Sequence, residues 1–258
     1  MTLLNSPQQD NPFAEALAPE YRDDEHFIER HANFLKLIQE TPIRLLFLGD
    51  SITRRWVENL EYWNAFFTPY QNANFGVGGD MAQNLLWRIQ NGELDNIQPE
   101  EIVLLIGTNN IPTHSAAEIT ATLRLIVATI QEKLPKTKIV LMAIFPRGPQ
   151  ERNKADESNP YLMDKVNAVN QNLMSLDDRD SIYFLDIGAS FLGPDGEIDT
   201  ALLPDRLHLI EPGYQVWGEA LKGIITELIK PIPLEATKKN SRAGRDHLSK
   251  PAPNERNL

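Results

Sequence analysis

The sequence predicts an α/β fold, a three-layer α/β/α sandwich around a five-stranded parallel sheet. Two observations carry this prediction. Short segments rich in Ile, Leu and Val alternate five times with longer segments of helical apolar spacing. The short segments are also apolar throughout, which is typical of strands buried on both faces between two layers of helices. Because crossovers between parallel strands are short and right-handed, the simplest strand order is 2-1-3-4-5.

Each of the first three expected strands ends where a glycine follows. The clearest cases are the first strand, which ends at Gly49–Asp50–Ser51, and the third, which ends at Gly107–Thr108–Asn109–Asn110. The second strand is a weaker candidate that runs into Gly76–Val77–Gly78–Gly79–Asp80. In chain order, the expected strands are 43–48, 70–75, 102–106, 138–144 and 182–186.

The expected helices follow from apolar spacing and from start and stop signals. Ser115 and Glu118 form a capping-box pattern, and Pro135 ends the helix that they begin. Asp80 can cap the helix that follows it, and Pro212 stands at the start of the last helix, where proline is tolerated. The expected helices are about 23–39, about 54–67, one starting after Asp80, one between Ser115 and Pro135, one opening at Asn159–Pro160, and about 212–229.

Composition narrows the possible classes of function. The 258 residues suit one large domain or two small ones, and a hydrophobic content of 41% is enough for a core. A net charge of −11 and a pI near 5.0 argue against non-specific binding to nucleic acid or to an anionic membrane surface. The absence of cysteine excludes disulfides, a thiolate nucleophile and thiolate metal sites. With no visible signal peptide and no apolar run of about 18–20 residues, we expect a cytoplasmic protein without a membrane span.

We expect one domain at residues 23–234, flanked by two polar segments. Residues 1–22 are expected to form an extension that lies loosely on the surface. Residues 235–258 are basic and show no apolar periodicity, which predicts a disordered tail. A solvated tail is the simpler interpretation, and a role in binding nucleic acid or a partner is the alternative.

Four unusual positions are expected to meet at one edge of the sheet, because ligands of such folds bind outside the carboxyl ends of the strands. Ser51 follows the first strand, Gly79 the second and Asn109 the third, and His208 lies in the loop region after the fifth. Each has a structural explanation when taken alone. Serine before a helix is usually a cap, glycine allows a tight turn, and asparagine can close its own loop.

Taken together, the same positions can form a nucleophile with its supporting groups. A serine hydroxyl needs a base, and a histidine base needs a partner that holds its ring. Of five histidines, His208 alone lies outside the first helix, the start of a helix and the tail, and Asp205 precedes it by three residues. Ser51, His208 and Asp205 would act as nucleophile, base and orienting group. The backbone N–H groups of Ser51 and Gly79 and the side-chain amide of Asn109 would form an oxyanion hole.

Other residues permit a functional and a structural interpretation. Arg147 could hold an anionic substrate group, but a surface ion pair is favoured. Trp56 and Trp63 could flank a sugar, but core packing is favoured. His31 falls on an apolar helix face, which favours a satisfied core or boundary position. Asp50 is expected to order the turn that carries Ser51 rather than to react.

These motifs resemble the four sequence blocks of the SGNH (GDSL) hydrolase family. The blocks are Gly49–Asp50–Ser51, the segment around Gly79, Gly107–Thr108–Asn109–Asn110 and Asp205-x-x-His208, in family order over roughly residues 40–230. The resemblance implies a flavodoxin-like hydrolase fold and the roles given above for Ser51, Asp205, His208, Gly79 and Asn109. It implies neither a metal nor an organic cofactor.

Within the family, several segments are similar to the catalytic alpha subunits of intracellular (type 1B) platelet-activating-factor acetylhydrolase. These segments are Asn74–Asp80, Gly107–Asn110, Pro146–Arg147–Gly148 and Leu207–His208–Leu209. Many family members have Gly-x-Asn-Asp in the third block, whereas this chain has Gly-Thr-Asn-Asn, as that subgroup does. A homodimer is suggested only by this resemblance.

The sequence thus predicts a serine ester hydrolase that removes short acyl groups, acetyl foremost, from a small acylated substrate. A deacetylase of sugars is the nearest alternative, because bacterial acetylesterases carry similar motifs. In a different class, the same fold could be a non-catalytic ligand-binding module, but the chain lacks the phosphate-binding patterns Gly-x-x-x-x-Gly-Lys-[Ser/Thr] and Gly-x-Gly-x-x-Gly. A partner protein with decayed activity is disfavoured because Ser51, Asp205 and His208 are all present.

Overall fold

A computed structural model describes residues 13–149 and 162–232 of the chain. Its sheet has five parallel strands in the order β2-β1-β3-β4-β5, which confirms the expected topology. The strands are β1 Leu45–Gly49, β2 Asn72–Gly76, β3 Glu101–Leu105, β4 Lys138–Met142 and β5 Ile182–Leu185. Because the strands are parallel, the loops after β1, β2 and β3 share one edge of the sheet, and the strand order reverses between β1 and β3.

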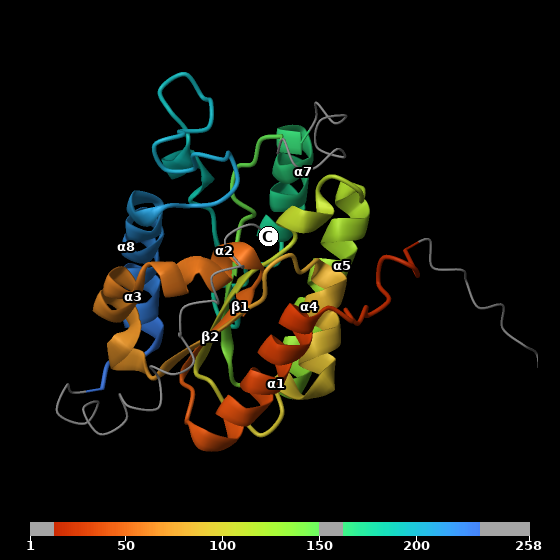
Figure 1. Cartoon of the computed structure of the whole chain (residues 1–258), viewed down its shortest axis with the longest axis vertical. Coiled ribbons are helices and arrows are strands. Elements are labelled where there is room, and N and C mark those ends of the chain that lie inside the picture. The colour runs from red at the N-terminus through yellow and green to blue at the C-terminus, as the bar shows by residue number, and fades with distance from the viewer. Residues whose placement is uncertain (1–12, 150–161, 233–258) are drawn as a thin grey trace, which may run out of the picture.

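Helices cover both faces of this sheet (Figure 1). The longer helices are α1 Glu25–Glu40, α3 Leu60–Phe67, α4 Ala82–Arg88, α5 Ala116–Lys133, α7 Leu162–Met174 and α8 Glu211–Leu228. The short helical segments are α2 Ser51–Arg54, η1 Arg55–Glu58, η2 Thr68–Tyr70, η3 Ile89–Glu93, η4 Thr108–Asn110 and η5 Gly188–Phe191. The capping box at the start of α5 is present as expected.

Alternate residues of β1, β3 and β4 contribute to two separate apolar clusters. On β1, Leu46 and Leu48 pack with α1, α4, α5 and α7, whereas Leu45 and Phe47 pack with α3 and α8. The same division holds along β3. Burial of both faces explains why β1, β3 and β4 are mainly apolar, and it confirms the expected sandwich, whereas β2 carries Asn72 and Asn74 on its second face.

The single helix expected over about 54–67 is divided into three pieces. Helical structure begins earlier, at Ser51, and α3 begins only after Asn59, whose φ of −127° and ψ of 45° are not helical. The Asn59 side-chain amide donates to the carbonyl of Arg55 at 3.1 Å and so closes the preceding turn. Asparagine competes for backbone groups in this way, and the apolar spacing gave no sign of it. Trp56 and Trp63 are buried in the core, as favoured.

Residues 13–22 are held to the domain rather than lying loosely. The Thr122 hydroxyl donates to the carbonyl of Ala16 at 2.9 Å, and the Asn84 amide donates to the carbonyl of Glu20 at 3.0 Å. The Glu20 N–H donates to the carbonyl of Gln83 at 3.1 Å. The segment therefore covers α4 and α5, and the expected boundary at residue 23 stays a prediction. Residues 1–12, the expected opening at Asn159–Pro160 and the basic tail lie outside the described residues.

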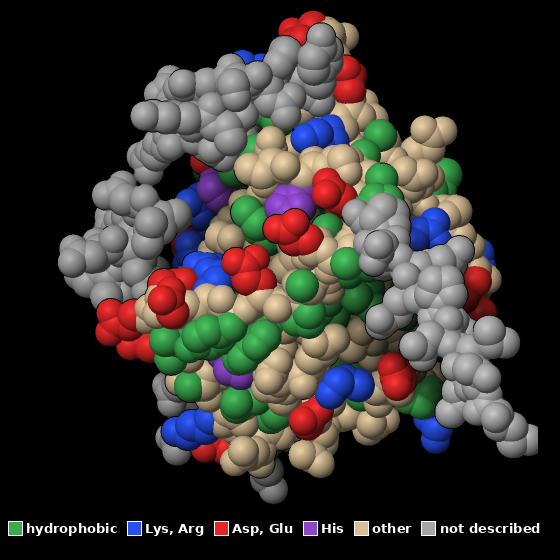
Figure 2. Space-filling model, turned by 90° about the vertical axis from the view of Figure 1, so that its right-hand side faces the viewer, with side chains coloured by type: hydrophobic (Ala, Val, Ile, Leu, Met, Phe, Trp, Pro, Cys, Tyr) green, Lys and Arg blue, Asp and Glu red, His purple; other side chains and the backbone are tan. Residues whose placement is uncertain are grey.

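The surface gives two further facts. Within 13–149 and 162–232, no helix combines the length and apolar character needed to cross a bilayer. On the face shown in Figure 2, Asp and Glu side chains lie among Lys and Arg side chains, so charges of one sign do not dominate that face.

Candidate active site

The turn after β1 places Ser51 at the first position of α2, where its side chain is buried. Asp50 precedes it, and its Oδ1 accepts the N–H of Ile52 at 2.9 Å, so Asp50 orders the turn as expected. Only glycine fits at position 49, because a Cβ there would lie 2.2 Å from the carbonyl oxygen of Leu105 and from the Thr53 hydroxyl. Because of this close approach, the start of α2 packs directly against the ends of β1 and β3, and this packing orients Ser51.

Ser51, His208 and Asp205 form a continuous chain of hydrogen bonds. The Ser51 Oγ lies 2.9 Å from His208 Nε2, and His208 Nδ1 lies 2.7 Å from Asp205 Oδ2. The other oxygen of Asp205 accepts the backbone N–H groups of His208 at 2.7 Å and of Leu207 at 3.0 Å. Arg206 has a φ of 61°, and this left-handed residue turns the chain so that the carboxylate and the imidazole meet.

Electrostatics favour an ionised Asp205. Partial burial alone would raise the pKa of Asp205, but the hydrogen bonds from the His208 side chain and from two backbone N–H groups outweigh it and lower the pKa to about 2. A carboxylate held in this way fixes the imidazole through its Nδ1 and leaves Nε2 directed at the serine hydroxyl. The arrangement can remove a proton from Ser51 and stabilise the imidazolium that results.

The turn after β2, which carries Gly79, is hydrogen-bonded to Asn109. Gly79 has a φ of 77°, which favours glycine, and it is followed by the buried Asp80. The side-chain amide of Asn109, in η4 after β3, donates to the carbonyl oxygen of Asp80 at 2.9 Å. Asn109 therefore reaches across to the neighbouring turn instead of closing its own loop. The turns that carry Ser51 and Gly79 are also joined, because the Val77 N–H donates to the carbonyl of Gly49 at 3.1 Å.

Asp80 does not cap the next helix, which corrects the expectation from the sequence. Its carboxylate instead accepts Arg22 Nη1 on Oδ1 and Arg88 Nε on Oδ2, each at 2.8 Å. The Met81 N–H at the start of α4 donates instead to the side-chain oxygen of Asn84 at 2.8 Å. Complete burial raises the pKa of Asp80 to about 6 although both arginines oppose that shift.

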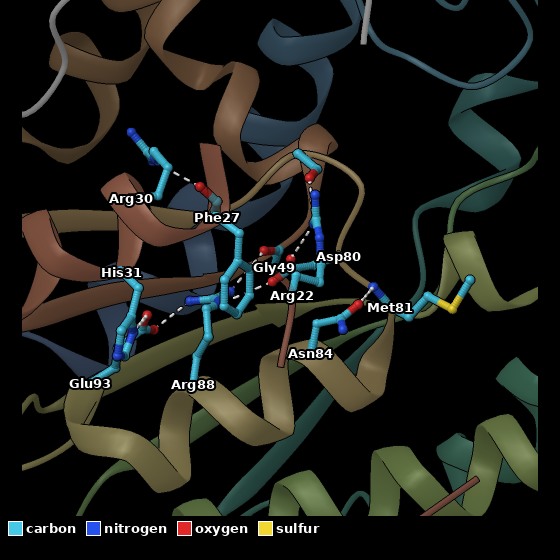
Figure 3. A network of polar contacts seen from close by, with 12 residues as sticks. Arg22, Phe27, Arg30, His31, Gly49, Asp80, Met81, Asn84, Arg88 and Glu93 are labelled. Carbon is cyan, nitrogen blue, oxygen red and sulfur yellow. Dashed lines mark hydrogen bonds and ion pairs between the residues drawn. The ribbon is translucent and has the colours of Figure 1, made fainter. Parts of the chain in front are cut away.

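A chain of polar contacts extends behind this turn, as Figure 3 shows. Arg88 is fully buried, contacts both Asp80 and Glu93, and its Nη2 lies 3.4 Å from the carbonyl oxygen of Gly49. His31 bonds the second oxygen of Glu93 at 2.9 Å, which places this histidine at a satisfied boundary position as favoured. Sequence reasoning missed this network. The one available signal was Arg88 itself, a charged residue on the apolar face of its helix.

Asn110 is another residue whose role was missed. Its side-chain oxygen accepts the N–H of Ala82 at 2.9 Å, and its amide donates to Gln83 Oε1 at 2.8 Å. These bonds tie the third sequence block to the first turn of α4. The second asparagine of Gly-Thr-Asn-Asn therefore supplies both an acceptor and a donor.

Arg147 is buried, so the surface position that was favoured for it is wrong. Its Nη1 donates to the carbonyl oxygen of Thr108 at 2.6 Å. The guanidinium thus supports the short segment that carries Asn109. No group of three or more His, Cys, Asp or Glu side chains within the described parts of the chain is arranged to hold a metal ion.

The family model of the GDSL-like lipases and acylhydrolases matches residues 47–216. The chain belongs to this family. The match starts within β1 and ends within α8, so it includes residues of all five strands and the segments that carry Ser51, Gly79, Asn109 and His208. The resemblance drawn from the four blocks is confirmed, and the protein is an SGNH-type ester hydrolase.

Named relatives in this GDSL family agree with the match. The alpha2 subunit of platelet-activating factor acetylhydrolase IB from Homo sapiens is 34% identical over 219 residues, which cover 84% of this chain and 91% of the relative. The alpha1 subunit from Bos taurus is 32% identical over 206 residues, which cover 80% and 85%.

Solved structures share the fold of this GDSL hydrolase. A GDSL-like lipase from Bacteroides thetaiotaomicron has a TM-score of 0.64 at 18% identity and covers 77% of this chain and 100% of its own. An acetyl xylan esterase has a TM-score of 0.53 at 19% identity, with 71% and 100% covered. At these identities, the likeness concerns the fold alone.

Proposed function

We propose that the protein hydrolyses short acyl esters through an acyl-enzyme on Ser51, with His208 as base and Asp205 as orienting group. The observation that carries the proposal is the unbroken hydrogen-bond chain from the Ser51 Oγ through both nitrogens of His208 to Asp205. A hydroxyl hydrogen-bonded to an oriented imidazole is the arrangement that activates serine as a nucleophile.

The proposed reaction has two stages. His208 takes the hydroxyl proton as the Ser51 Oγ attacks the ester carbonyl, and the imidazolium then protonates the leaving alcohol as the ester bond breaks. In the second stage, His208 takes a proton from water, whose oxygen attacks the acyl-enzyme and releases the carboxylic acid. The proton returns to the Ser51 Oγ, so the enzyme ends as it began.

The carbonyl oxygen gains negative charge in both stages and needs hydrogen-bond donors. The N–H groups of Ser51 and Gly79 and the amide of Asn109 are proposed as these donors. The support is that Asn109 is bonded to the turn of Gly79, and that this turn is bonded to the end of β1. Removal of one such donor typically lowers the rate by about 10²–10³-fold.

Acetyl is the acyl group that we favour. The two relatives named above are described as acetylhydrolases, and each matches four fifths or more of this chain. A sugar deacetylase is the second candidate, supported by the fold shared with an acetyl xylan esterase. Hydrolysis rates for acetylated xylo-oligosaccharides and for 2-acetyl phospholipid analogues, measured side by side, distinguish the two.

The mechanism is tested with p-nitrophenyl esters of increasing acyl length and with the variant Ser51→Ala. We expect the acetyl ester to be hydrolysed fastest and the variant to lose about 10⁴-fold or more of the turnover. Ser175→Ala is the matched control, since Ser175 is exposed and its hydroxyl donates to the carbonyl of Asn172 and accepts from Arg124. Wild-type turnover by Ser51→Ala would overturn the mechanism. A non-catalytic binding module would also leave Ser51 unlabelled by an organophosphonate.

A homodimer and a cytoplasmic location are proposed only on the resemblance to the acetylhydrolase alpha subunits and on the sequence. Sedimentation equilibrium measures the first, and a mass of one chain at micromolar concentration contradicts it. Fractionation of the source cells measures the second. The division into residues 1–22, 23–234 and 235–258 is tested by limited proteolysis, with cleavage expected first beyond residue 234.

A further inference from the structure

The buried guanidinium of Arg88 joins the two turns that carry the proposed oxyanion donors. Its Nε donates to Asp80 Oδ2 at 2.8 Å, and its Nη2 donates to the carbonyl oxygen of Gly49 at 3.4 Å. Its Nη1 bonds the Glu93 carboxylate. Figure 3 shows the side chain extending from α4 toward both turns. Arg88 thus links the end of β1 to the residues that precede and follow α4.

Each proposed donor lies within two residues of an Arg88 partner or is bonded to one. Gly79 directly precedes Asp80, and Ser51 follows Gly49 by two residues. The Asn109 amide donates to the backbone carbonyl of Asp80. A displacement of Asp80 relative to Gly49 would therefore change the distances from the Ser51 N–H to both other donors at once.

We propose that Arg88 is a positioning residue for ester hydrolysis, which sets the spacing between the Ser51 turn and the Gly79 turn. This inference rests on the proposed function. Arg88 is fully buried behind the two turns and acts on the reaction only through Gly49 and Asp80. A shift of about 1 Å in groups that position a reaction can lower the rate by about 10²-fold.

The shape of the guanidinium matters as well as its charge. Arginine presents its donors in a rigid planar fork, so it can hold Asp80, Glu93 and Gly49 in three fixed directions. Lysine carries the same charge on a single nitrogen and cannot reproduce this fork. A residue that served only to neutralise two buried carboxylates would be replaced well by lysine. Arg88→Lys therefore separates positioning from simple charge compensation.

The test compares Arg88→Lys with Arg44→Lys, using p-nitrophenyl acetate as substrate and a methyl trifluoromethyl ketone as inhibitor. The ketone adduct places its oxyanion where the transition state would, so its affinity reports on the donors. For Arg88→Lys, we expect kcat to fall about 10–100-fold with KM within about twofold, and inhibitor affinity to fall by the same factor as kcat. Arg44 bonds Glu100 and the carbonyl of Lys230 away from the site, so Arg44→Lys is expected to match the wild type.

Circular dichroism and urea unfolding first establish that the variants are folded. If Arg88→Lys does not fold, Asp80→Asn is measured instead, since it removes the charged partner at the same contact with a side chain of equal shape, and the same pattern is expected. A folded variant with wild-type kcat and inhibitor affinity overturns the proposal, as does a fall in kcat without a fall in inhibitor affinity. Ser51→Ala is assayed in parallel. If its turnover is retained, the proposed function itself has failed, whereas its loss beside an unaffected Arg88→Lys refutes only the positioning role.

Discussion

The Asp205–His208 turn and the Gly79–Asp80 turn lie at the same edge of the sheet but are held in opposite ways. Asp205 is bonded to residues two and three positions away, and its side chain is 45% exposed. Asp80 is fully buried and is bonded to arginines that are 58 and eight residues away. These bonds of Asp205 are therefore local, and solvent reaches its carboxylate. The Gly79–Asp80 turn depends on ionic contacts that exist only when the whole domain is folded.

This difference predicts that the Asp205–His208 turn serves the reaction, whereas the network around Asp80 supports the structure of the site. A local turn can be altered with little effect on the rest of the fold, so damage there should appear in activity. A buried network cannot lose one charge without leaving another uncompensated, so damage there should appear in stability as well. Four predictions test this division, from the largest expected effect to the smallest.

Replacing His208 should have the largest effect on activity. His208→Gln removes the base, and we expect kcat for p-nitrophenyl acetate to fall about 10⁴-fold or more while the urea midpoint stays close to that of the wild type. His247→Gln is the control, because His247 lies outside residues 47–216, which the family model matches. Retention of a tenth of the activity by His208→Gln would contradict the role of this turn.

Replacing Arg88 by an apolar residue should have the largest effect on stability. Arg88→Met leaves the carboxylates of Asp80 and Glu93 buried without their shared partner, and we expect the free energy of unfolding to fall by about 3–5 kcal/mol. Chemical denaturation with urea measures this change. A loss below about 1 kcal/mol would show that the contacts of Arg88 with Asp80 and Glu93 contribute little to stability, which would contradict the prediction.

Glu101 offers a buried carboxyl without the partners that Asp80 has. Neither of its side-chain oxygens has a hydrogen-bond partner among the described residues, and burial raises its pKa to about 8. The folded pKa lies above that of the unfolded chain, near 4.5, so stability should be lost as pH rises between these two values. This group alone contributes a slope of at most about 1.4 kcal/mol per pH unit. Urea unfolding from pH 5 to pH 8 should show a smaller decline for Glu101→Gln, and equal declines for both proteins would contradict the prediction.

Replacing Arg206 should have the smallest effect. Its guanidinium lies 3.5 Å from Glu197 at the exposed surface, and such pairs contribute little. We expect Arg206→Ala to change the free energy of unfolding by less than about 0.5 kcal/mol. A loss comparable to that of Arg88→Met would remove the distinction between the exposed turn and the buried network.

The fold was predictable because its signal is repeated along the chain. Five apolar strands alternating with helices leave few ways to bury both faces of a sheet, and the strand order followed from connection rules. The break at Asn59 was not predictable from apolar spacing, because it depends on one side chain bonding Arg55 rather than on the periodic residues.

The contacts of the candidate site could be predicted where the residues are close in the sequence and not where they are distant. The pairing of Asp205 with His208 could be predicted, since three residues of separation are enough for contact. The contacts of Asp80 with Arg22 and Arg88 could not, because composition does not show which charges become buried or which distant segments meet. Arg147 was misjudged for the same reason: an arginine after a strand is usually exposed, and here the chain buries it against Thr108.

The central claim is that Ser51 carries the acyl group during turnover. The most direct measurement is mass spectrometry of the protein quenched in acid during hydrolysis of an acetyl ester, followed by peptide mapping. We predict one acetyl group on the peptide that contains Ser51 and none on the same peptide of Ser51→Ala. Full turnover by the wild type with no acetyl group on Ser51 at any quench time would contradict the account.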